Sequence, residues 1–241
     1  MDLRNIDQNN FEKLKNSSVN SAILALGSME QHGNHLPFST DTIIAQHISE
    51  IVAEKTNSFL LPPLYYGVSF EHFPLFNISI KHNIIVEYIS DICTSLIKNG
   101  IQKLYVINGH HGNAGLLQYI GQNISSNHIP VNDFFYCINY WQLMEQYFDH
   151  AGKVETSLML AICPELVKMD LARSGFNVEP KDNSLQRIGI NMSINNPGGF
   201  IKFTKNGIWG NPLESSMSEG ERILSGVIEK IIFLIANKNF M

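Results

Sequence analysis

Acidic and imidazole side chains stand close together in residues 27–41, which read GSMEQHGNHLPFSTD. Glu30 and His32 are two residues apart, so in extended backbone both side chains point to the same side. Asp41 follows where a helical spacing begins. A mixed set of carboxylate oxygens and imidazole nitrogens suits Zn, Mn or Fe(II). The alternative is an exposed polar loop in which Asp41 caps a helix.

A second group of imidazoles occurs in residues 108–113, which read NGHHGN. The glycines on either side of His110 and His111 allow a tight turn and a close approach of the backbone to a bound group. This loop and the loop with Glu30 and His32 both follow predicted buried strands. Ligand sites in parallel sheets form at the carboxyl ends of the strands, so the coincidence favours a metal site.

A third group lies in residues 150–157, which read HAGKVETS. His150 and a glycine precede Glu155, which opens a short apolar helix. An acid in the first turn of a helix is also favoured by the helix dipole, so a capping role for Glu155 is the alternative. The two preceding groups make a functional role for His150 and Glu155 the preferred interpretation.

Strand and helix patterns alternate along the chain and place these groups on one sheet. This alternation predicts an α/β fold, a three-layer α/β/α sandwich with a mainly parallel sheet, formed as a single domain over residues 1–241. Residues 177–210 are rich in Asn, Gly and Pro and are expected to form loops with at most one short strand or hairpin. The expected strands are Ser21–Leu26, Ser58–Leu64, Lys103–Ile107 and Asp133–Asn139, and the expected helices are Thr40–Lys55, His82–Lys98, Asn113–Ser126, Glu155–Ile162 and Glu214–Ala236.

Composition narrows the class of protein. The chain has 241 residues, a formal net charge of −5 and no cluster of Lys and Arg, which argues against a nucleic-acid partner. No apolar stretch is long enough to span a membrane, and the polar amino terminus does not read as a signal peptide. The three cysteines are widely spaced, which disfavours disulfides and zinc ribbons. We therefore expect a cytoplasmic enzyme.

Taken together, the segments GSMEQHGNHLP with Asp41, NGHHGN and HAGKVETS resemble the creatininase (creatinine amidohydrolase) family. The segment GIWGNP, residues 207–212, resembles a late loop of the same family. The resemblance implies an α/β/α sandwich, one or two divalent metal ions, a small-molecule amide substrate cleaved by a metal-activated water, and a homo-oligomer, often a hexamer. It implies that the metal ligands are Glu30, His32, Asp41 and His110, and that Asp41 bridges the two ions. It also implies a catalytic role for His150. Glu155 is implied to be an acid at the site that either binds an ion directly or supports the ligands, and that takes part in catalysis.

Two departures from the creatinine-cleaving members concern the substrate. Those members carry Glu two residues after the NGH histidine, where this chain has Gly112, and Trp four residues before the catalytic histidine, where it has Gln146. The missing ligand is expected from Glu155, with His111 as the alternative. We therefore expect the substrate of this chain to resemble those of the formamide hydrolases of the family, such as formylaminopyrimidine nucleotide deformylases, more than creatinine. Creatinine hydrolysis, trimming of a small peptide in redox-cofactor maturation and a non-catalytic metal scaffold remain the alternatives.

Other polar and aromatic residues have two interpretations. Asn108 is expected to donate hydrogen bonds to ligands or substrate, and His111 and Trp209 are candidate substrate contacts. For Trp209, aromatic packing is the alternative. Glu71 and His72 lie between apolar patches and are expected at the surface or in an oligomer contact rather than as ligands.

Overall fold

The sheet consists of four strands, β1 (Ser21–Leu26), β2 (Phe59–Leu60), β3 (Lys103–Asn108) and β4 (Phe135–Asn139), which all run parallel in the order β2-β1-β3-β4. In its middle, β1 and β3 pair with Ala25 beside Ile107 and Leu26 beside Asn108. Both strands are almost entirely buried, which explains their continuous apolar sequence. The computed structural model describes all residues except 127–132, 148, 176–193, 195 and 238–241.

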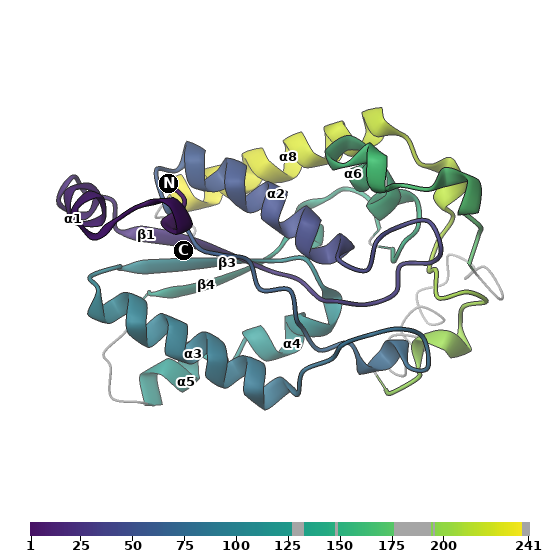
Figure 1. The fold of residues 1–241 in the computed structure, drawn as a ribbon, viewed down its shortest axis with the longest axis horizontal. Coiled ribbons are helices and arrows are strands. Elements are labelled where there is room, and N and C mark those ends of the chain that lie inside the picture. The colour runs from purple at the N-terminus through teal and green to yellow at the C-terminus, as the bar shows by residue number, and fades with distance from the viewer. Residues whose placement is uncertain (127–132, 148, 176–193, 195, 238–241) are drawn as a thin grey trace.

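Helices cover both faces of this sheet and bury one apolar cluster on each side (Figure 1). On one face, α6 and α8 pack together so closely that a Cβ at Gly220 would overlap the Ser157 carbonyl oxygen. The predicted three-layer α/β/α sandwich is therefore confirmed. That face carries α2 (Thr40–Lys55), α6 (Lys153–Ile162) and α8 (Met217–Ala236), and the other carries α3 (His82–Lys98), α4 (Ala114–Leu117) and α5 (Ile120–Ser126).

The strand order creates a switch point between β1 and β3. The chain leaves β1 toward β2 on one side, whereas it leaves β3 toward β4 on the other side. The loops after β1 and β3 therefore diverge at the carboxyl ends of these strands, which is where open parallel sheets bind ligands. Both histidine-bearing loops predicted from the sequence leave the sheet at this point.

Several predicted boundaries differ from the structure for local reasons. The strand expected over Ser58–Leu64 shrinks to Phe59–Leu60, because Pro62 and Pro63 have no N–H to donate to a neighbouring strand. The last helix begins at Met217 rather than Glu214, because the Ser216 side chain accepts a hydrogen bond from the Glu219 N–H at 3.3 Å and caps it there.

The helix expected over Asn113–Ser126 is divided into a 3-10 turn (His111–Asn113), α4 and α5. The glycines at 115 and 121 lower helix stability in this stretch. Much of the loop region 177–210 lies outside the described residues. Its described part contains a 3-10 turn, Phe200–Lys202, and an isolated bridge between Trp209 and His150 rather than a strand.

The amino-terminal segment adds α1 (Gln8–Asn16), a helix that the sequence analysis does not predict. The Asp7 side chain accepts the Asn10 N–H at 2.8 Å and begins the helix, and Phe11 packs against Phe59 with 5.2 Å between ring centroids. The Met1 ammonium group donates to the Ser58 carbonyl at 3.1 Å. These contacts attach the amino terminus to the end of the sheet opposite the switch point (Figure 1).

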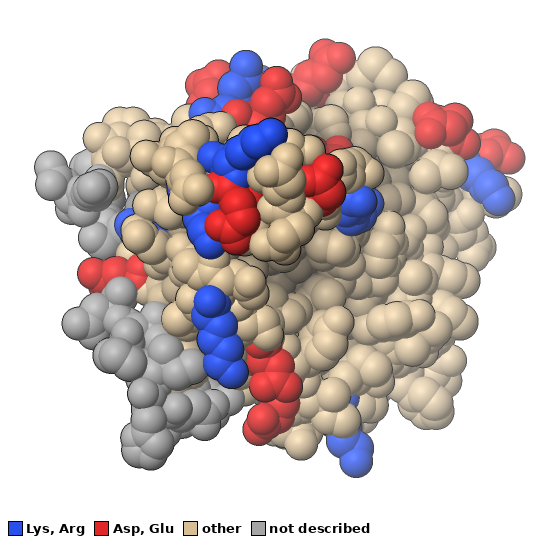
Figure 2. Space-filling view, turned by 60° about the vertical axis from the view of Figure 1, so that its left-hand side comes forward, with Lys and Arg blue, Asp and Glu red and all other residues tan. Residues whose placement is uncertain are grey.

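The surface of the molecule shows mixed charge on the face drawn in Figure 2, where Lys and Arg side chains lie among Asp and Glu side chains. Neither sign forms a continuous patch on that face. Within the described part of the chain, no helix has the length and apolar character needed to cross a membrane.

Candidate metal centre

The switch point gathers side chains from three elements. Glu30 and His32 lie in the loop after β1, and His110 lies two residues beyond the end of β3. Asp41 lies in the first turn of α2, which follows the same β1 loop. A Cβ at Gly109 would overlap the Asp41 carbonyl oxygen, so the glycine permits α2 to approach the β3 loop. The fold thereby brings together residues from distant parts of the sequence.

A first group of ligand atoms is formed by Glu30, Asp41 and His110. His110 Nδ1 lies 3.1 Å from Asp41 Oδ2 and 3.3 Å from Glu30 Oε2. Its other ring nitrogen, Nε2, donates to the Val68 carbonyl at 2.8 Å, which directs Nδ1 toward the two carboxylates. These buried side chains can converge on a single ion.

A second group of ligand atoms is formed by His32, His150 and Glu155, and Asp41 lies between the two groups. His32 Nε2 lies 3.1 Å from Asp41 Oδ1 and 3.6 Å from Glu155 Oε2. The two oxygens of Asp41 thus face different histidines, as a carboxylate bridging two ions would require. The helix-cap alternative for Asp41 is not what the structure has, because Ser39 occupies the N-cap position of α2.

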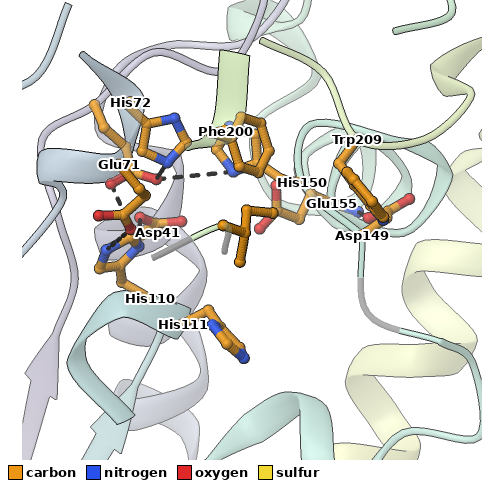
Figure 3. A pocket seen from close by; sticks show the side chains of 12 residues that line it. Asp41, Glu71, His72, His110, His111, Asp149, His150, Glu155, Phe200 and Trp209 are labelled. Carbon is orange, nitrogen blue, oxygen red and sulfur yellow. Dashed lines mark hydrogen bonds and ion pairs between the residues drawn. The ribbon is translucent and has the colours of Figure 1, made fainter. Parts of the chain in front are cut away.

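His150 lies against both groups. Its Nδ1 is 3.7 Å from Glu30 Oε1, and its Nε2 donates to the Gln31 carbonyl at 3.0 Å. Its ring lies tilted against that of His32, with 4.3 Å between centroids, and meets the Phe200 ring edge-on at 4.8 Å. The side chain is therefore held at the edge of the carboxylate cluster by the Phe200 ring and by Gln31, whose side-chain Nε2 also lies 3.1 Å from His150 Nε2 (Figure 3).

Burial and ion pairing shift the protonation of this cluster. Burial favours a higher pKa for Glu30, but His110 and His72 outweigh it and hold the pKa of that carboxyl well below its usual value. Burial favours a lower pKa for His32, but the Asp41 carboxylate contributes most to raising it to about 10. Imidazolium groups therefore balance the carboxylates, and a divalent ion entering the cluster would displace protons.

Several buried carboxylate oxygens of the cluster lack well-formed hydrogen bonds, and this property fits a metal site. Both Glu30 oxygens and Asp41 Oδ2 are buried and have only imidazole nitrogens as polar neighbours, the nearest at 3.0 to 3.3 Å, and Glu155 Oε1 has no hydrogen-bond partner among the described residues. Buried carboxylate oxygens without hydrogen bonds are costly unless a cation lies beside them. Imidazole nitrogens and carboxylate oxygens are also the donor set that Zn, Mn and Fe(II) prefer. The residues present therefore fit one or two divalent ions.

One oxygen of Glu155, Oε2, both holds the turn before its helix and lies 3.6 Å from His32 Nε2. Its Oε2 accepts the Ala151 N–H at 2.6 Å, whereas Oε1 has no such partner among the described residues. Burial raises the pKa of Glu155 well above its usual value. Capping and metal binding are thus compatible for this residue, and the groups of candidate ligands contain Glu155 rather than His111.

The expectation that Glu71 and His72 lie at the surface is wrong. Both are buried and line the cavity, with His72 Nε2 3.0 Å from Glu30 Oε1 and Glu71 Oε1 3.6 Å from His110 Nε2. They lie in a 3-10 turn, Phe70–His72, that folds over the site. The sequence signal was weak because no predicted strand or helix ends at this turn.

Of the three expected substrate contacts, two line the cavity and one does not. Trp209 and His111 line the cavity, and Trp209 exchanges backbone hydrogen bonds with His150 at 2.8 and 3.0 Å. Asn108 does not line it, since its side chain bonds the His110 N–H at 3.1 Å and the Asn139 side chain at 2.8 Å. Gln146 also lies elsewhere and donates to Glu219 at 3.2 Å.

Asp149 is a cavity residue that the sequence analysis missed. Its carboxylate accepts the Val154 N–H at 2.9 Å and the Glu155 N–H at 3.3 Å, so it holds the first turn of α6 that carries Glu155. Burial raises the pKa of Asp149 to about 7. An acid directly before a helix is a capping signal in a sequence. Asp149 is harder to recognise as one, because Gly152 and not Asp149 occupies the N-cap position of α6.

Comparison with known proteins identifies the family of the chain. The family model described as creatininase, creatinine amidohydrolase, matches residues 5–235. The chain is 29% identical over 230 residues to the mycofactocin precursor peptide peptidase of Mycolicibacterium smegmatis, which covers 88% of this chain and 83% of that protein. It is 28% identical over 176 residues to creatinine amidohydrolase of Pseudomonas putida, covering 61% of this chain and 66% of that protein.

Two further comparisons concern a third activity and the fold. The chain is 31% identical over 112 residues to a 2-amino-5-formylamino-6-ribosylaminopyrimidin-4(3H)-one 5'-monophosphate deformylase of Methanocaldococcus infernus, covering 43% of this chain and 47% of that protein. The solved structure named "Creatininase Mn" superposes with a TM-score of 0.82 at 22% identity, covering 97% of this chain and 96% of that one, and this likeness shows a common fold. With its family model matched over nearly the whole length, the chain belongs to the creatininase family of amidohydrolases.

Proposed function

We propose that this protein hydrolyses an amide C–N bond of a small molecule at a centre that holds two divalent ions. The observation that carries the proposal is Asp41, whose two oxygens each lie 3.1 Å from a different histidine, His32 and His110. A single carboxylate between two ligand groups is the arrangement that a pair of ions needs. Glu30 and Glu155 supply the further oxygens of the two groups.

The chemistry needs an activated water and a proton donor for the departing nitrogen. Bound divalent ions lower the pKa of water toward about 7 and polarise the carbonyl of an amide. His150 is suited to move the proton, because burial and the neighbouring His32 and His72 lower its pKa and keep the imidazole neutral. With Nε2 donating to Gln31, the Nδ1 lone pair faces the carboxylate cluster and can take up a proton and return it to the leaving nitrogen.

The walls of the cavity would position the substrate and exclude water. The Phe200 ring is tilted against His72 and meets His150 edge-on, with centroid distances of 4.6 and 4.8 Å, and Trp209 lies beyond it. His111 lines the same cavity on the side of the β3 loop. A planar amide-bearing ring or formamide would fit between such aromatic walls, with His111 as a hydrogen-bonding partner.

A formamide is the substrate class we favour. Gly112 removes the carboxylate found in creatinine-cleaving relatives, and Gln146 lies against Glu219 rather than in the cavity. The similarity to a formylaminopyrimidine nucleotide deformylase supports this choice. A small modified peptide is the second candidate, because the relative named as a mycofactocin precursor peptide peptidase covers 88% of the chain.

The test is product release by protein stripped with a chelator and reloaded with Mn, Zn or Fe(II). A formylaminopyrimidine nucleotide, creatinine and a short precursor peptide are offered side by side. We expect formate release from the first, abolished by chelator and by Asp41→Asn. His150→Gln is expected to keep its ions and to lose at least about a hundredfold in turnover, because it lacks a group for proton transfer.

The controls separate the parts of the proposal. His82→Gln changes an exposed histidine at the start of α3 and should leave turnover unchanged. Full activity of Asp41→Asn would remove the assigned site from the reaction. Release of a cleaved peptide alone would replace the formamide with the second candidate, and ion binding without hydrolysis of any of the three amides would contradict an enzymatic role.

A further inference from the structure

The side chain of Gln31 is fixed in one orientation by backbone groups of two loops. Its Oε1 accepts the Gly33 N–H at 3.0 Å, and its Nε2 donates to the Gly207 carbonyl at 2.8 Å. A Cβ at Gly207 would overlap the amide, so the glycine lets the two loops close around it. Turning the amide over would place oxygen against oxygen and N–H against N–H. The buried Gln31 side chain therefore presents an N–H, and not an oxygen, to the site.

The second proton of this amide nitrogen is available to His72. Gln31 Nε2 lies 2.9 Å from His72 Nδ1, and an amide nitrogen can only donate. The same nitrogen lies 3.1 Å from His150 Nε2, but that ring nitrogen gives its own proton to the Gln31 carbonyl at 3.0 Å. The two amide protons thus have two acceptors, the Gly207 carbonyl and His72 Nδ1.

The acceptor role of Nδ1 decides where the proton of His72 lies. A ring with a single proton that accepts at Nδ1 carries this proton on Nε2. His72 Nε2 lies 3.0 Å from Glu30 Oε1, whereas Glu30 Oε2 faces His110 Nδ1 in the first group. The rings of His150 and Phe200, each with its centroid 4.6 Å from that of His72, confine its plane (Figure 3). One oxygen of Glu30 therefore faces an imidazole N–H, and the other is left for an ion.

A third ion is the alternative role for this part of the cavity. Glu30, His72 and His150 offer ligand atoms close enough to hold one. Such an ion would need the lone pair of His72 Nε2, so the proton of the ring would have to move to Nδ1. It would then oppose the Gln31 N–H across 2.9 Å. The orientation of Gln31 therefore favours a donor role for His72 over a ligand role.

We propose that Gln31 and His72 are positioning residues: Gln31 keeps the His72 proton on Nε2, and this N–H holds Glu30 so that its Oε2 binds an ion of the first group. The inference rests on the proposed two-ion centre. It adds that the cluster of Glu30, His72 and His150 takes no third ion. Carboxylates that bind metals are themselves held by neighbouring donors, and loss of such a donor typically lowers metal affinity by about 10- to 100-fold.

The position of the proton is measured directly in the full chain. Protein with nitrogen-15 in its histidine rings is stripped and reloaded with Zn, and the signals of His72 are those missing from the spectrum of His72→Gln. We expect a proton on Nε2 and none on Nδ1 in the Zn-loaded wild type. A proton on Nδ1, with Nε2 bound to Zn, would overturn the proposal and make His72 a ligand.

Ion binding tests the hold on Glu30. Stripped wild type, His72→Gln, His72→Leu and His82→Gln are titrated with Mn by calorimetry, and bound metal per chain is counted. We expect two ions in wild type and in His82→Gln, whose ring is exposed on α3. His72→Leu should bind one ion at least about tenfold more weakly, because it has no N–H to donate. His72→Gln should recover most of this affinity, because its amide can donate in place of Nε2.

A double-mutant cycle tests whether Gln31 acts through His72. Gln31→Met keeps the length of the side chain and removes the amide, so it should weaken the same ion in wild type and add little in His72→Leu. Circular dichroism checks that each variant is folded. Equal losses in both backgrounds would overturn the role of Gln31. Unchanged affinity in His72→Leu, or a third ion in wild type, would overturn that of His72 and leave the two-ion centre standing. A wild-type chain that binds no ions would overturn the proposed function itself.

Discussion

At the scale of single residues, His35 couples the fold to pH. It is 1% exposed and its Nε2 lies 2.9 Å from Thr156 Oγ1 in α6. Burial, aided by the nearby His32, lowers the pKa of His35 to about 4. The unfolded chain takes up this proton near pH 6.5, so between pH 6.5 and 4 the unfolded state binds more protons than the folded state. The free energy of unfolding therefore falls as the pH falls through this window.

The prediction is tested by urea unfolding of chelator-treated protein at pH 7 and pH 5. One histidine contributes a slope of up to about 1.4 kcal/mol per pH unit. His35→Gln should show a smaller loss of stability between the two pH values than wild type does. His82→Gln, at an exposed position, should keep the wild-type slope. An unchanged slope in His35→Gln would show that other groups cause the acid sensitivity.

The residues of the site differ in how far the sequence could predict them. Glu30, His32 and His110 follow buried strands, so the parallel-sheet rule alone brings them to one edge. For Asp41 the sequence allowed either a helix-capping role or a role as metal ligand. Only the positions of His32 and His110 in the structure decide between these two roles. Glu71 could not be predicted, because the turn that carries it is held by contacts with the β3 loop rather than by any local pattern.

At the scale of elements, the distance between α2 and the β3 loop sets the geometry of the centre. A Cβ at Gly109 would overlap the Asp41 carbonyl oxygen and lie 3.0 Å from Ala45 Cβ. We expect Gly109→Ala to push the first turn of α2 outward, with a loss of about 1–3 kcal/mol in stability. Because Asp41 lies in that turn, ion affinity should fall together with stability.

Gly115→Ala provides a matched control within the same loop region. A Cβ there meets nothing within 4 Å, and the position is helical in α4, so the variant should gain about 0.5–1 kcal/mol. Thermal unfolding and bound metal per chain are measured for both variants. Normal ion binding by Gly109→Ala would mean that the α2 contact is not what positions Asp41.

Regular elements were predictable where their patterns are local. The bounds of β1, α2 and α3 agree with the sequence, because continuous apolar residues, helical spacing and the Asn99-Gly100 stop act over short distances. The division of 113–126 and the shortened β2 depend on glycine and proline effects that a periodic pattern understates. Helix α1 was missed because it is stabilised by docking of Phe11 on Phe59 rather than by its own apolar content.

At the scale of the whole molecule, ion binding should contribute to stability, because the candidate ligands come from the loops after β1 and β3 and from α2 and α6. A ligand that binds only the folded chain at 100 times its Kd stabilises it by about 2.7 kcal/mol. For a chain of this size we expect a rise of roughly 5–10 °C in Tm on adding Mn to stripped protein. Asp41→Asn should show no such rise, and an equal rise in that variant would place the stabilising ion elsewhere.

Assembly of the molecule remains a prediction. The homo-oligomer implied by the sequence resemblance needs an apolar surface, and the segment leading over the site offers one. Tyr66 is 48% exposed, Phe73 65% and Phe76 46%. Residues next to the 3-10 turn would then meet a second copy close to the cavity. Treating the chain as one domain over residues 1–241 likewise remains our proposal.

The amino terminus and the carboxyl end of α8 lie at the end of the sheet opposite the switch point (Figure 1). The Met1 ammonium group, bonded to Ser58, is thus remote from the ligand groups around Asp41. A support surface, fluorophore or fusion partner joined at either position would leave the mouth of the cavity unobstructed. The protein can therefore be tethered for sensing or flow applications without redesigning the loops that carry its chemistry.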